Sequence, residues 1–505
     1  MNKKRLPKST YPNRYEIELD VDLDNFSYTG AQKVDLNVVE ATNNIVLNSV
    51  GIEVTKAKIQ TTKQDIPLEV NYIEEDEKIV FESQETLSEG VYELYLEFNS
   101  EITNDLKGFY KSSYMSEDGE KKWIATTQFE PTAARSAFPC WDEPEYKAIF
   151  SMTIITDEKY LRVSNEMVVE EEKVENNKLR TKFADSMKMS SYLVAFVIGD
   201  LEATVVGKSK TTDIRIIHRP GFSHQTSYAG TAAIKLLDFF EDYYKIPYPG
   251  TKLDLIAIPD FAMGAMENVG AVTFRENLLL FDKDKATRSE LDRSITVIAH
   301  ELAHMWFGDL VTMKWWDGIW LNEAFASLME VIASYNTYPE FKQWNAMNMS
   351  RTAGFSIDSL ENSRPVEFDV ETPDQAEEMF DVLTYEKGST VLRMFQMFIG
   401  EEAFQNGVEA YLNKFKFENT NSSDLWDALS EASNQPLNKI LPFWIREKGY
   451  PFLQVDCSNN FLTIKQKPFL LKNVETDKNN IKPVPVQIKF LDTGNEEKFL
   501  LDETE

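Results

Sequence analysis

Two histidines four residues apart, His300 and His304, restrict the possible structures of this sequence more than any other feature. In a helix, residues four apart project from the same face, so both imidazole rings can reach one zinc ion at about 2.0–2.1 Å. Glu301 is placed to act on a metal-bound water instead of binding the metal. The segment Met305–Phe307 is apolar, which predicts a buried helix, where two unpaired histidines would be costly. A surface helix with two chance histidines is disfavoured, because the 505-residue chain has only 4 histidines.

A third metal ligand is predicted at Glu323, in the segment Trp320–Ala324. The segment between His304 and Glu323 is long enough for the first helix to end, for the chain to turn and for a second helix that carries Glu323 to begin. Three protein ligands with an open fourth position are typical of a catalytic zinc site, whereas structural zinc sites have four. The pattern therefore predicts one catalytic Zn²⁺ per chain, bound by His300, His304 and Glu323.

Composition limits the class of protein. The length of 505 residues implies about three domains, and 42% hydrophobic residues are enough for a packed core. The net charge of −30 argues against nucleic acid or an anionic membrane as a partner. The two cysteines, Cys140 and Cys457, do not suggest a disulfide framework. No apolar run long enough for a signal sequence or a membrane span occurs, so we expect a soluble cytoplasmic protein.

The chain divides into three regions by the period of its apolar residues. Residues 1–202 alternate between apolar and polar, with turn signals at Tyr28–Gly30 and Glu117–Gly119, which predicts an antiparallel β-domain. Residues 203–449 follow a mainly helical period, and Thr287 with Glu290 forms a predicted capping box for the zinc helix. A strand is expected at Leu253–Pro259. Strand patterns return in residues 450–505. We therefore predict a multidomain α+β protein.

A long segment, Thr127–Pro144, interrupts the alternation of the β-domain. The residues alone favour a structural loop, held by an ion pair from Arg135 to Asp142 or Glu143. Loops also carry function often, so a functional loop is the alternative.

Four segments together resemble those of the aminopeptidase N-like zinc aminopeptidases, a branch of the gluzincin metallopeptidases. They are the Thr127–Pro144 loop, Gly264–Asn268, His300–Glu323 and Tyr385–Gly388. They occur in the family's order and cover essentially the whole chain. The resemblance implies a thermolysin-like catalytic domain, followed by a short C-terminal β-sandwich segment.

The resemblance also implies roles for particular residues. The segment formed by Gly264, Ala265, Met266, Glu267 and Asn268 is expected to lie along the first residues of a peptide substrate. Its Glu267 and the loop residue Glu130 are expected to hold the free α-ammonium group, and Gln128 to line the pocket for the first side chain. Two carboxylates on a buried cation give charge-assisted hydrogen bonds. The segment Thr127–Pro144 is thus expected to be functional.

Tyr385 resembles the family tyrosine whose hydroxyl stabilises the tetrahedral oxyanion, and without the resemblance it would be interpreted as a core aromatic residue.

Two residues differ from the usual family pattern. Val269 stands where the family has tryptophan, and Ala324 where it often has glycine. The chain also ends part-way through the expected β-segment, so the family's long helical C-terminal domain is expected to be absent. Its missing segment is a possible partner.

The predicted reaction is hydrolysis of the first peptide bond of a peptide with a free N-terminus. Zinc would polarise the carbonyl and lower the pKa of its water towards about 7, with Glu301 as general base. Three alternatives are a thermolysin-like endopeptidase, an epoxide hydrolase of the leukotriene-hydrolase type and a non-enzymatic scaffold. A thermolysin-like endopeptidase would share the metal site, but it would have no use for the segment Gly264–Asn268. An epoxide hydrolase of the leukotriene-hydrolase type shares nearly all the motifs. The presence of all three ligands and Glu301 disfavours the scaffold.

Overall fold

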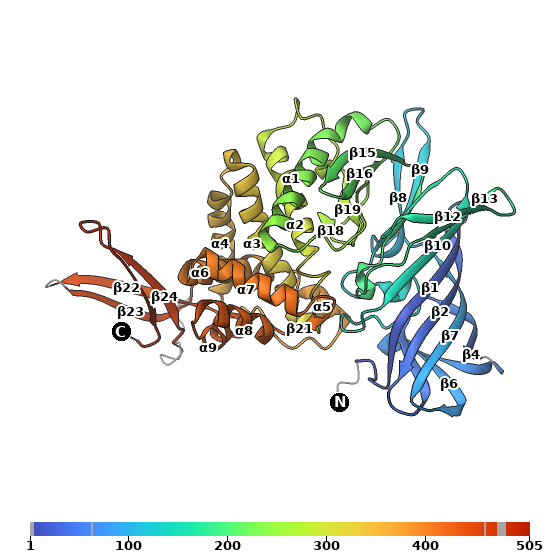
Figure 1. Ribbon diagram of the computed structural model, residues 1–505, viewed down its shortest axis with the longest axis horizontal. Coiled ribbons are helices and arrows are strands. Elements are labelled where there is room, and N and C mark those ends of the chain that lie inside the picture. The colour runs from blue at the N-terminus through green and yellow to red at the C-terminus, as the bar shows by residue number, and fades with distance from the viewer. Residues whose placement is uncertain (1–4, 62–63, 459–460, 472–480, 505) are drawn as a thin grey trace.

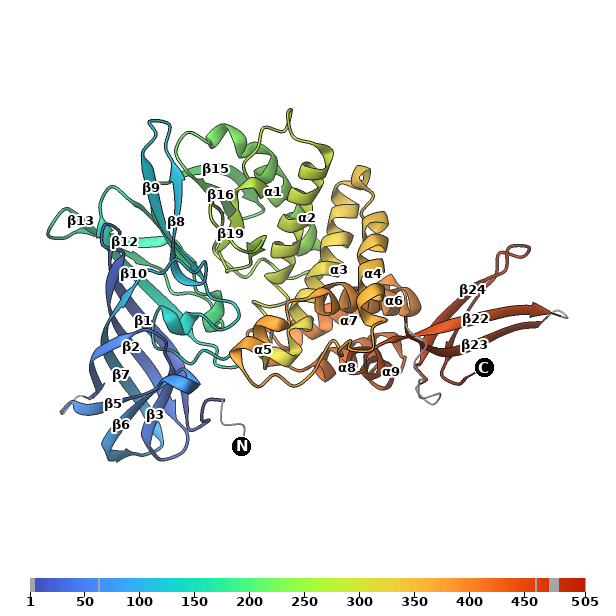
Figure 2. The same cartoon turned by 180° about the vertical axis from the view of Figure 1, so that it is seen from behind.

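The computed structural model describes residues 5–61, 64–458, 461–471 and 481–504. Three regions follow one another along the long axis of the molecule (Figures 1 and 2). A region of sheets at one end is followed by a mainly helical region and then by two β-hairpins at the other end. The α+β architecture agrees with the sequence prediction. No helix among the described residues is long and apolar enough to cross a membrane.

The large N-terminal sheet has ten strands among the described residues. In spatial order they are β12 (Val168–Lys173), β13 (Lys178–Phe183), β10 (Ile149–Asp157), β1 (Thr10–Asp22), β2 (Ser27–Val38), β7 (Gly90–Glu101), β4 (Glu53–Gln60), β5 (Ile66–Ile73), β6 (Lys78–Leu87) and β3 (Thr42–Asn48). Alternate residues of β1 are buried, as the sequence pattern predicts. The pairing of β1 with β10 is parallel, however, so the sheet is mixed instead of wholly antiparallel.

One predicted turn is wrong. Tyr28–Gly30 lies inside β2, and the chain turns earlier, between β1 and β2. Gly30 has a packing role there, because a Cβ atom at this position would lie 2.2 Å from the ring of Phe98 on β7. A glycine in a strand can mark such a close approach as well as a turn. The turn predicted at Glu117–Gly119 does join two paired strands, β8 (Gly108–Met115) and β9 (Lys121–Gln128).

A smaller sheet leads from the N-terminal region to the helical one. Its spatial order is β11 (Leu161–Ser164), β14 (Phe196–Gly199), β9 and β8. Strand β9 ends at Gln128, where the long loop begins. Buried polar contacts join residues that follow this loop to the helical region. The Lys147 ammonium donates to the carbonyls of Asp309 and Leu310, and the Tyr192 hydroxyl donates to the carbonyl of Gly308.

The helical region also contains a five-stranded sheet among the described residues. Its order is β15 (Glu202–Ser209), β16 (Thr212–His218), β17 (Lys252–Ile258), β19 (Ala271–Arg275) and β18 (Ala265–Met266). The helices are α1 (Ser227–Tyr244), α2 (Arg288–His304), α3 (Trp320–Thr337), α4 (Gln343–Asp358), α5 (Pro373–Glu378), α6 (Gly388–Ile399), α7 (Glu401–Lys414), α8 (Ser422–Ser433) and α9 (Leu437–Ile445). Two short strands, β20 (Thr312–Met313) and β21 (Asn419–Thr420), pair in parallel.

Helices α2 and α3 form the centre of this region. The predicted capping box is present at the start of α2, where the Thr287 side chain accepts from the Glu290 amide and the Glu290 carboxylate accepts from the Thr287 amide. These bonds satisfy amides that the first turn of a helix leaves free. Behind the helices, the rings of Phe307 and Phe325 stack with their centroids 4.1 Å apart. This packing holds the end of α2 against α3.

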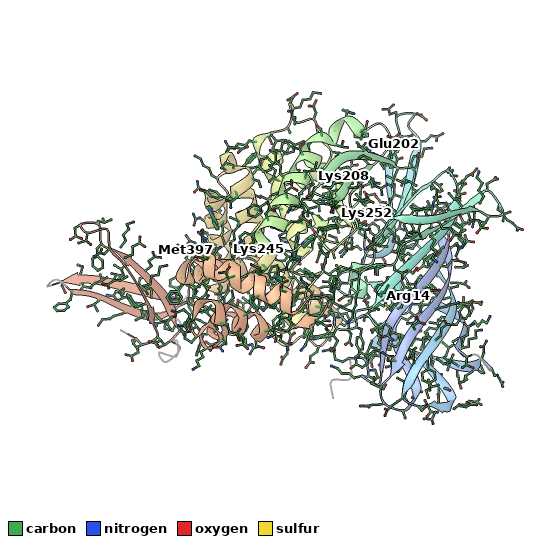
Figure 3. All side chains as sticks on the ribbon, viewed as in Figure 1. Arg14, Glu202, Lys208, Lys245, Lys252 and Met397 are labelled. Carbon is green, nitrogen blue, oxygen red and sulfur yellow. The ribbon has the colours of Figure 1, made fainter. Side chains whose placement is uncertain are left out.

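The C-terminal region consists of two hairpins in the described residues. Strand β22 (Tyr450–Ser458) pairs with β23 (Phe461–Phe469), and β24 (Val484–Lys489) pairs with β25 (Glu496–Leu501). Met397 at the end of α6 lies where the helical region meets these hairpins (Figure 3). Its carbonyl accepts a hydrogen bond from the Lys498 ammonium at 2.9 Å. The second hairpin is thus attached to α6.

Candidate metal centre and active site

The predicted metal ligands converge. The Nε2 atom of His300 lies 3.2 Å from Oε2 of Glu323, and the Nε2 atom of His304 lies 3.3 Å from the same oxygen. Helix α2 supplies both histidines from one face, and α3 supplies Glu323. A tetrahedral ion with ligand bonds of about 2.0–2.1 Å separates its ligands by about 3.3–3.4 Å. The three side chains therefore fit a metal site.

The second nitrogen of each imidazole ring is already engaged. Nδ1 of His304 lies 2.9 Å from the carbonyl of Phe307, which can only accept, so this nitrogen donates. Nε2 then faces the Glu323 carboxylate with a lone pair unless the ring is protonated. Nδ1 of His300 lies 2.8 Å from Oε2 of Glu330. The Nε2 lone pair and the Glu323 carboxylate repel each other unless a cation or a proton lies between them. Such a group of lone pairs and negative charge is typical of a metal site.

The electrostatics of the cluster also favour positive charge. Burial alone disfavours the charged form of His304, but Glu267 and Glu323 outweigh it and raise the pKa of His304 to about 10. Burial would likewise raise the pKa of Glu323, yet the two histidines lower it to about 2. The pocket thus holds a carboxylate that stays ionised beside two nitrogen ligands, which suits a bound cation.

Glu301 lies on α2 between the two histidines and is 5% exposed. Burial raises the pKa of Glu301 to about 8, an effect that the two histidines oppose and Glu267 reinforces. The carboxyl group is therefore buried beside the ligand cluster but is not part of the ligand set.

The long loop after β9 is held as the sequence predicts, by Arg135 and Asp142. The Arg135 Nε atom donates to Oδ2 of Asp142 at 2.9 Å. The loop also places Glu130 near the candidate metal ligands, since the charges of Glu267, Glu323 and His304 shift the pKa of its buried carboxyl group. The structural and the functional interpretation of the loop are thus compatible. Arg135 fixes the loop, and Glu130 faces the site.

Three predicted substrate-binding side chains have buried oxygens without a hydrogen-bond partner. These atoms are Oε1 of Gln128, Oε1 of Glu130 and Oε1 of Glu267. Burial, together with the neighbouring carboxylates of Glu267 and Glu323, raises the pKa of Glu130 well above its ordinary value. Oε1 of Glu267 lies 3.7 Å from Nδ1 of His304, next to the metal cluster. Unpaired buried acceptors are costly, so the group suits a ligand that brings donors.

The segment Gly264–Asn268 runs along the edge of the five-stranded sheet. Ala265 pairs with Phe274 and Met266 pairs with Thr273, so β18 uses one side for β19 and is the last strand of the sheet. Nε2 of Gln128 lies 3.4 Å from the Met266 sulfur, which brings the long loop against this strand. An edge strand can pair with a peptide.

The side chain of Val269, which differs from the usual family pattern, is buried. It is 1% exposed and belongs to the core. Its carbonyl accepts from the Asn165 side-chain amide at 2.9 Å. The neighbouring Asn268 is also buried, and its side-chain nitrogen lies 3.3 Å from the Thr273 hydroxyl oxygen. This end of the segment is therefore fixed by the core.

Tyr385 lies beside the metal cluster, although it is remote in sequence. Its ring stacks on His300, with the centroids 6.0 Å apart and the planes 21° apart. Burial, with Glu323 and Glu130 nearby, raises the pKa of the Tyr385 hydroxyl well above its ordinary value. The hydroxyl therefore keeps its proton and can act as a hydrogen-bond donor at neutral pH.

Family models match both large regions. Residues 228–444 match the peptidase family M1 domain, and residues 11–193 match the peptidase M1 N-terminal domain. The chain belongs to peptidase family M1. The two matched regions of this M1 chain supply the site together, because Gln128 and Glu130 come from the first and the ligand cluster comes from the second.

Proteins named as aminopeptidases are among the relatives of this M1 chain. It is 39% identical to aminopeptidase M1-A of Oryza sativa subsp. japonica, over 98% of this chain and 58% of that protein. It is 41% identical to aminopeptidase M1 of Arabidopsis thaliana, over 92% and 53%, respectively. Identity to the puromycin-sensitive aminopeptidase of Caenorhabditis elegans is 38%, over 99% and 54%. The chain spans about half the length of these curated relatives.

One residue of the candidate site, Glu330, was not predicted from the sequence. It follows Glu323 by two helical turns on α3, so both carboxylates lie on the same face and reach His300 from two sides. The spacing could have indicated it, because metal-binding histidines commonly donate their second nitrogen to a carboxylate.

Proposed function

We propose that this chain is a zinc-dependent aminopeptidase that hydrolyses the first peptide bond of peptides with a free N-terminus. The proposal depends on the buried oxygens of Glu130 and Glu267 that lack a hydrogen-bond partner and lie beside His300, His304 and Glu323. Two carboxylates there suit an α-ammonium group, which offers three donors and a positive charge. Family membership supports the same reaction class.

His300, His304 and Glu323 would hold the zinc ion. When bound, zinc supplies a Lewis acid that polarises the scissile carbonyl and lowers the pKa of water to about 7. Glu301 would accept a proton from the attacking water and pass it to the leaving amine nitrogen. The Tyr385 hydroxyl would donate a hydrogen bond to the carbonyl oxygen as it becomes negative. Its raised pKa supports this role, because the donor proton is retained.

The position of the anchor explains why cleavage would remove one residue. Glu130 and Glu267 bind the amino end of the peptide next to the metal cluster, so the bond presented for attack is the first one. The edge strand β18 would pair with the backbone that follows. An acetylated terminus would leave both carboxylates desolvated and unpaired, and this penalty discriminates against blocked peptides.

Glu267→Gln and Glu130→Gln are expected to weaken transition-state binding of unblocked substrates by about 1.5–3 kcal/mol each, the range for a hydrogen bond to a charged group. The measurement is kcat/KM on matched free and N-acetylated aminoacyl reporters. The preference for the free substrate should shrink in both variants. Glu241→Gln is the matched control, since Glu241 is a buried glutamate on α1 that accepts from the Tyr248 amide. Full preference in the Glu267→Gln enzyme would place the anchor elsewhere.

Glu330→Ala is expected to reduce zinc affinity about 10- to 100-fold, the usual effect of losing the partner of a metal-binding histidine. The reason is that Oε2 of Glu330 fixes the orientation of the His300 ring through Nδ1. Zinc affinity is measured by competition with a chelator, and Glu330→Gln should retain more of it because the amide oxygen can still accept. Unchanged affinity in Glu330→Ala would mean that packing alone orients His300.

We also propose a domain division at residues 202 and 449, a thermolysin-like catalytic domain, β-sandwich character of the C-terminal hairpins and a cytoplasmic location. The endopeptidase alternative predicts cleavage without a free amino terminus, so the free and N-acetylated reporters separate it from the aminopeptidase. The epoxide-hydrolase alternative is tested by offering the zinc-loaded protein an epoxide substrate.

A further inference from the structure

The segment that carries Tyr385 has an unusual backbone. Residues Leu383–Lys387 form a π-helical turn that continues directly into α6. Such turns are rare and have poorer internal hydrogen bonding than an α-helix, so contacts from outside have to maintain them. The turn is packed against both α3 and α4.

An ion pair fixes the start of the turn. Oδ1 of Asp381 accepts from the amides of Leu383 and Thr384 at 2.9 and 3.1 Å. The same oxygen accepts from the Arg364 guanidinium at 2.5 Å, and Arg364 also donates to the Thr384 hydroxyl at 3.1 Å. Asp381 thus satisfies the first amides of the turn, and Arg364 holds Asp381 in place.

A second, more deeply buried ion pair fixes the end of the turn. The Lys387 ammonium lies 2.9 Å from Oδ2 of Asp358 on α4, with side-chain exposures of 7% and 3%. Lys387 also donates to the carbonyl of Glu447 at 3.2 Å, and Oδ1 of Asp358 accepts from the Gly449 amide at 2.8 Å. The end of the turn is therefore tied to α4 and to the segment that leads into β22.

Close packing between Gly388 and Ala324 determines how near the π-helical turn lies to α3, the helix that carries Glu323. A Cβ atom at Gly388 would lie 2.6 Å from the Cβ of Ala324, the residue after Glu323. Glycine allows α6 to approach α3 this closely. The turn thus has fixed contacts on two ends and one side, and Tyr385 lies between them.

We propose that the Arg364–Asp381 and Asp358–Lys387 ion pairs are a positioning clamp that holds the Tyr385 hydroxyl at the reacting carbonyl. The inference rests on the proposed function, because it assigns these residues to the same reaction. None of the four touches the substrate in this scheme. They act through Tyr385, whose position determines how well it stabilises the transition state.

The test is the double variant Asp358→Asn/Lys387→Met. It removes both charges of the buried pair together, which avoids leaving one of them uncompensated. The amide oxygen introduced by Asp358→Asn would still accept from the Gly449 amide. We expect kcat on an unblocked aminoacyl reporter to fall about 10- to 100-fold, the effect of a displacement on the order of 1 Å. KM and zinc content should change little. Arg446→Met is the control, since Arg446 pairs with Glu367 at 2.7 Å instead of with either end of the turn.

Repeating the double variant in a Tyr385→Phe background separates positioning from general damage. If the clamp acts through the hydroxyl, its loss should cost almost nothing once the hydroxyl is gone. Equal losses of kcat in both backgrounds would overturn the proposal, as would normal kcat in Asp358→Asn/Lys387→Met. If that variant does not fold, Asp381→Asn tests the other end of the turn in the same two backgrounds, with the same outcomes. A Tyr385→Phe enzyme with full kcat would instead contradict the proposed role of Tyr385, and this inference with it.

Discussion

Glu301→Gln is expected to lose peptidase activity by about 10²- to 10⁴-fold while it retains its zinc. The amide has nearly the size of the carboxylate, so the packing around this 5% exposed side chain should be preserved. It cannot accept the proton of the attacking water, however. Glu301 lies outside the ligand cluster of His300, His304 and Glu323, which is why the metal should stay bound.

The measurement is kcat/KM on an unblocked aminoacyl reporter, with zinc content determined on the same sample. Thermal unfolding should show that the variant is at least as stable as the unmodified protein, because burial raises the pKa of the Glu301 carboxyl and a neutral amide avoids that cost. A zinc-replete Glu301→Gln enzyme with near-normal turnover would falsify the assignment of Glu301 as general base.

Glu323→Ala is expected to lose zinc itself, and activity with it. Oε2 of Glu323 lies within 3.3 Å of both histidine Nε2 atoms, so its removal takes away one ligand and the charge that balances the cation. Loss of a partner of a ligand costs about 10- to 100-fold in metal affinity, and loss of the ligand should cost more. Chelator competition measures the affinity directly.

Stability gives an independent readout of the same variant. Zinc that binds only the folded state raises the unfolding temperature of the unmodified protein, and this shift should disappear in Glu323→Ala. Glu330→Ala is the graded comparison, because it should reduce the shift without abolishing it. Full zinc binding by Glu323→Ala would mean that the metal is held by other groups.

The candidate metal ligands could be predicted because the signals that place them lie within short segments of the sequence. His300 and His304 are placed by helical spacing alone, and the Thr287 capping box fixes where their helix begins. Glu323 was predictable because the segment between His304 and Glu323 is long enough for one helix to end and a second to begin, as α2 and α3 do. The strand prediction at Leu253–Pro259 was equally local and agrees with β17.

Other parts of the site depend on contacts between distant segments, which the residues alone do not reveal. Glu130 lies in a loop whose visible feature, the Arg135–Asp142 ion pair, indicated only a structural role. Tyr385 would be interpreted as a core aromatic residue until its stacking on His300 is known. The resemblance to a family placed both, whereas the π-helical turn around Tyr385 has no signal in the period of the sequence.

Gly30 illustrates the opposite error, in which a local signal is overruled by packing. Glycine after Tyr28 and Thr29 is typical of a turn, yet here it makes room for the Phe98 ring of a neighbouring strand. The parallel pairing of β1 with β10 could not be predicted either, because the alternation of apolar and polar residues identifies strands but not their partners.

The proposed aminopeptidase activity is tested most directly by the products formed from a single peptide with a free N-terminus and from its N-acetylated twin. Mass spectrometry after incubation with the zinc-loaded protein follows both substrates, with Glu301→Gln as the blank. We expect the free peptide to lose its first residue while the acetylated twin stays intact, and a chelator to stop the reaction until zinc is restored. Internal cleavage, or equal cleavage of both peptides, would contradict the proposed activity.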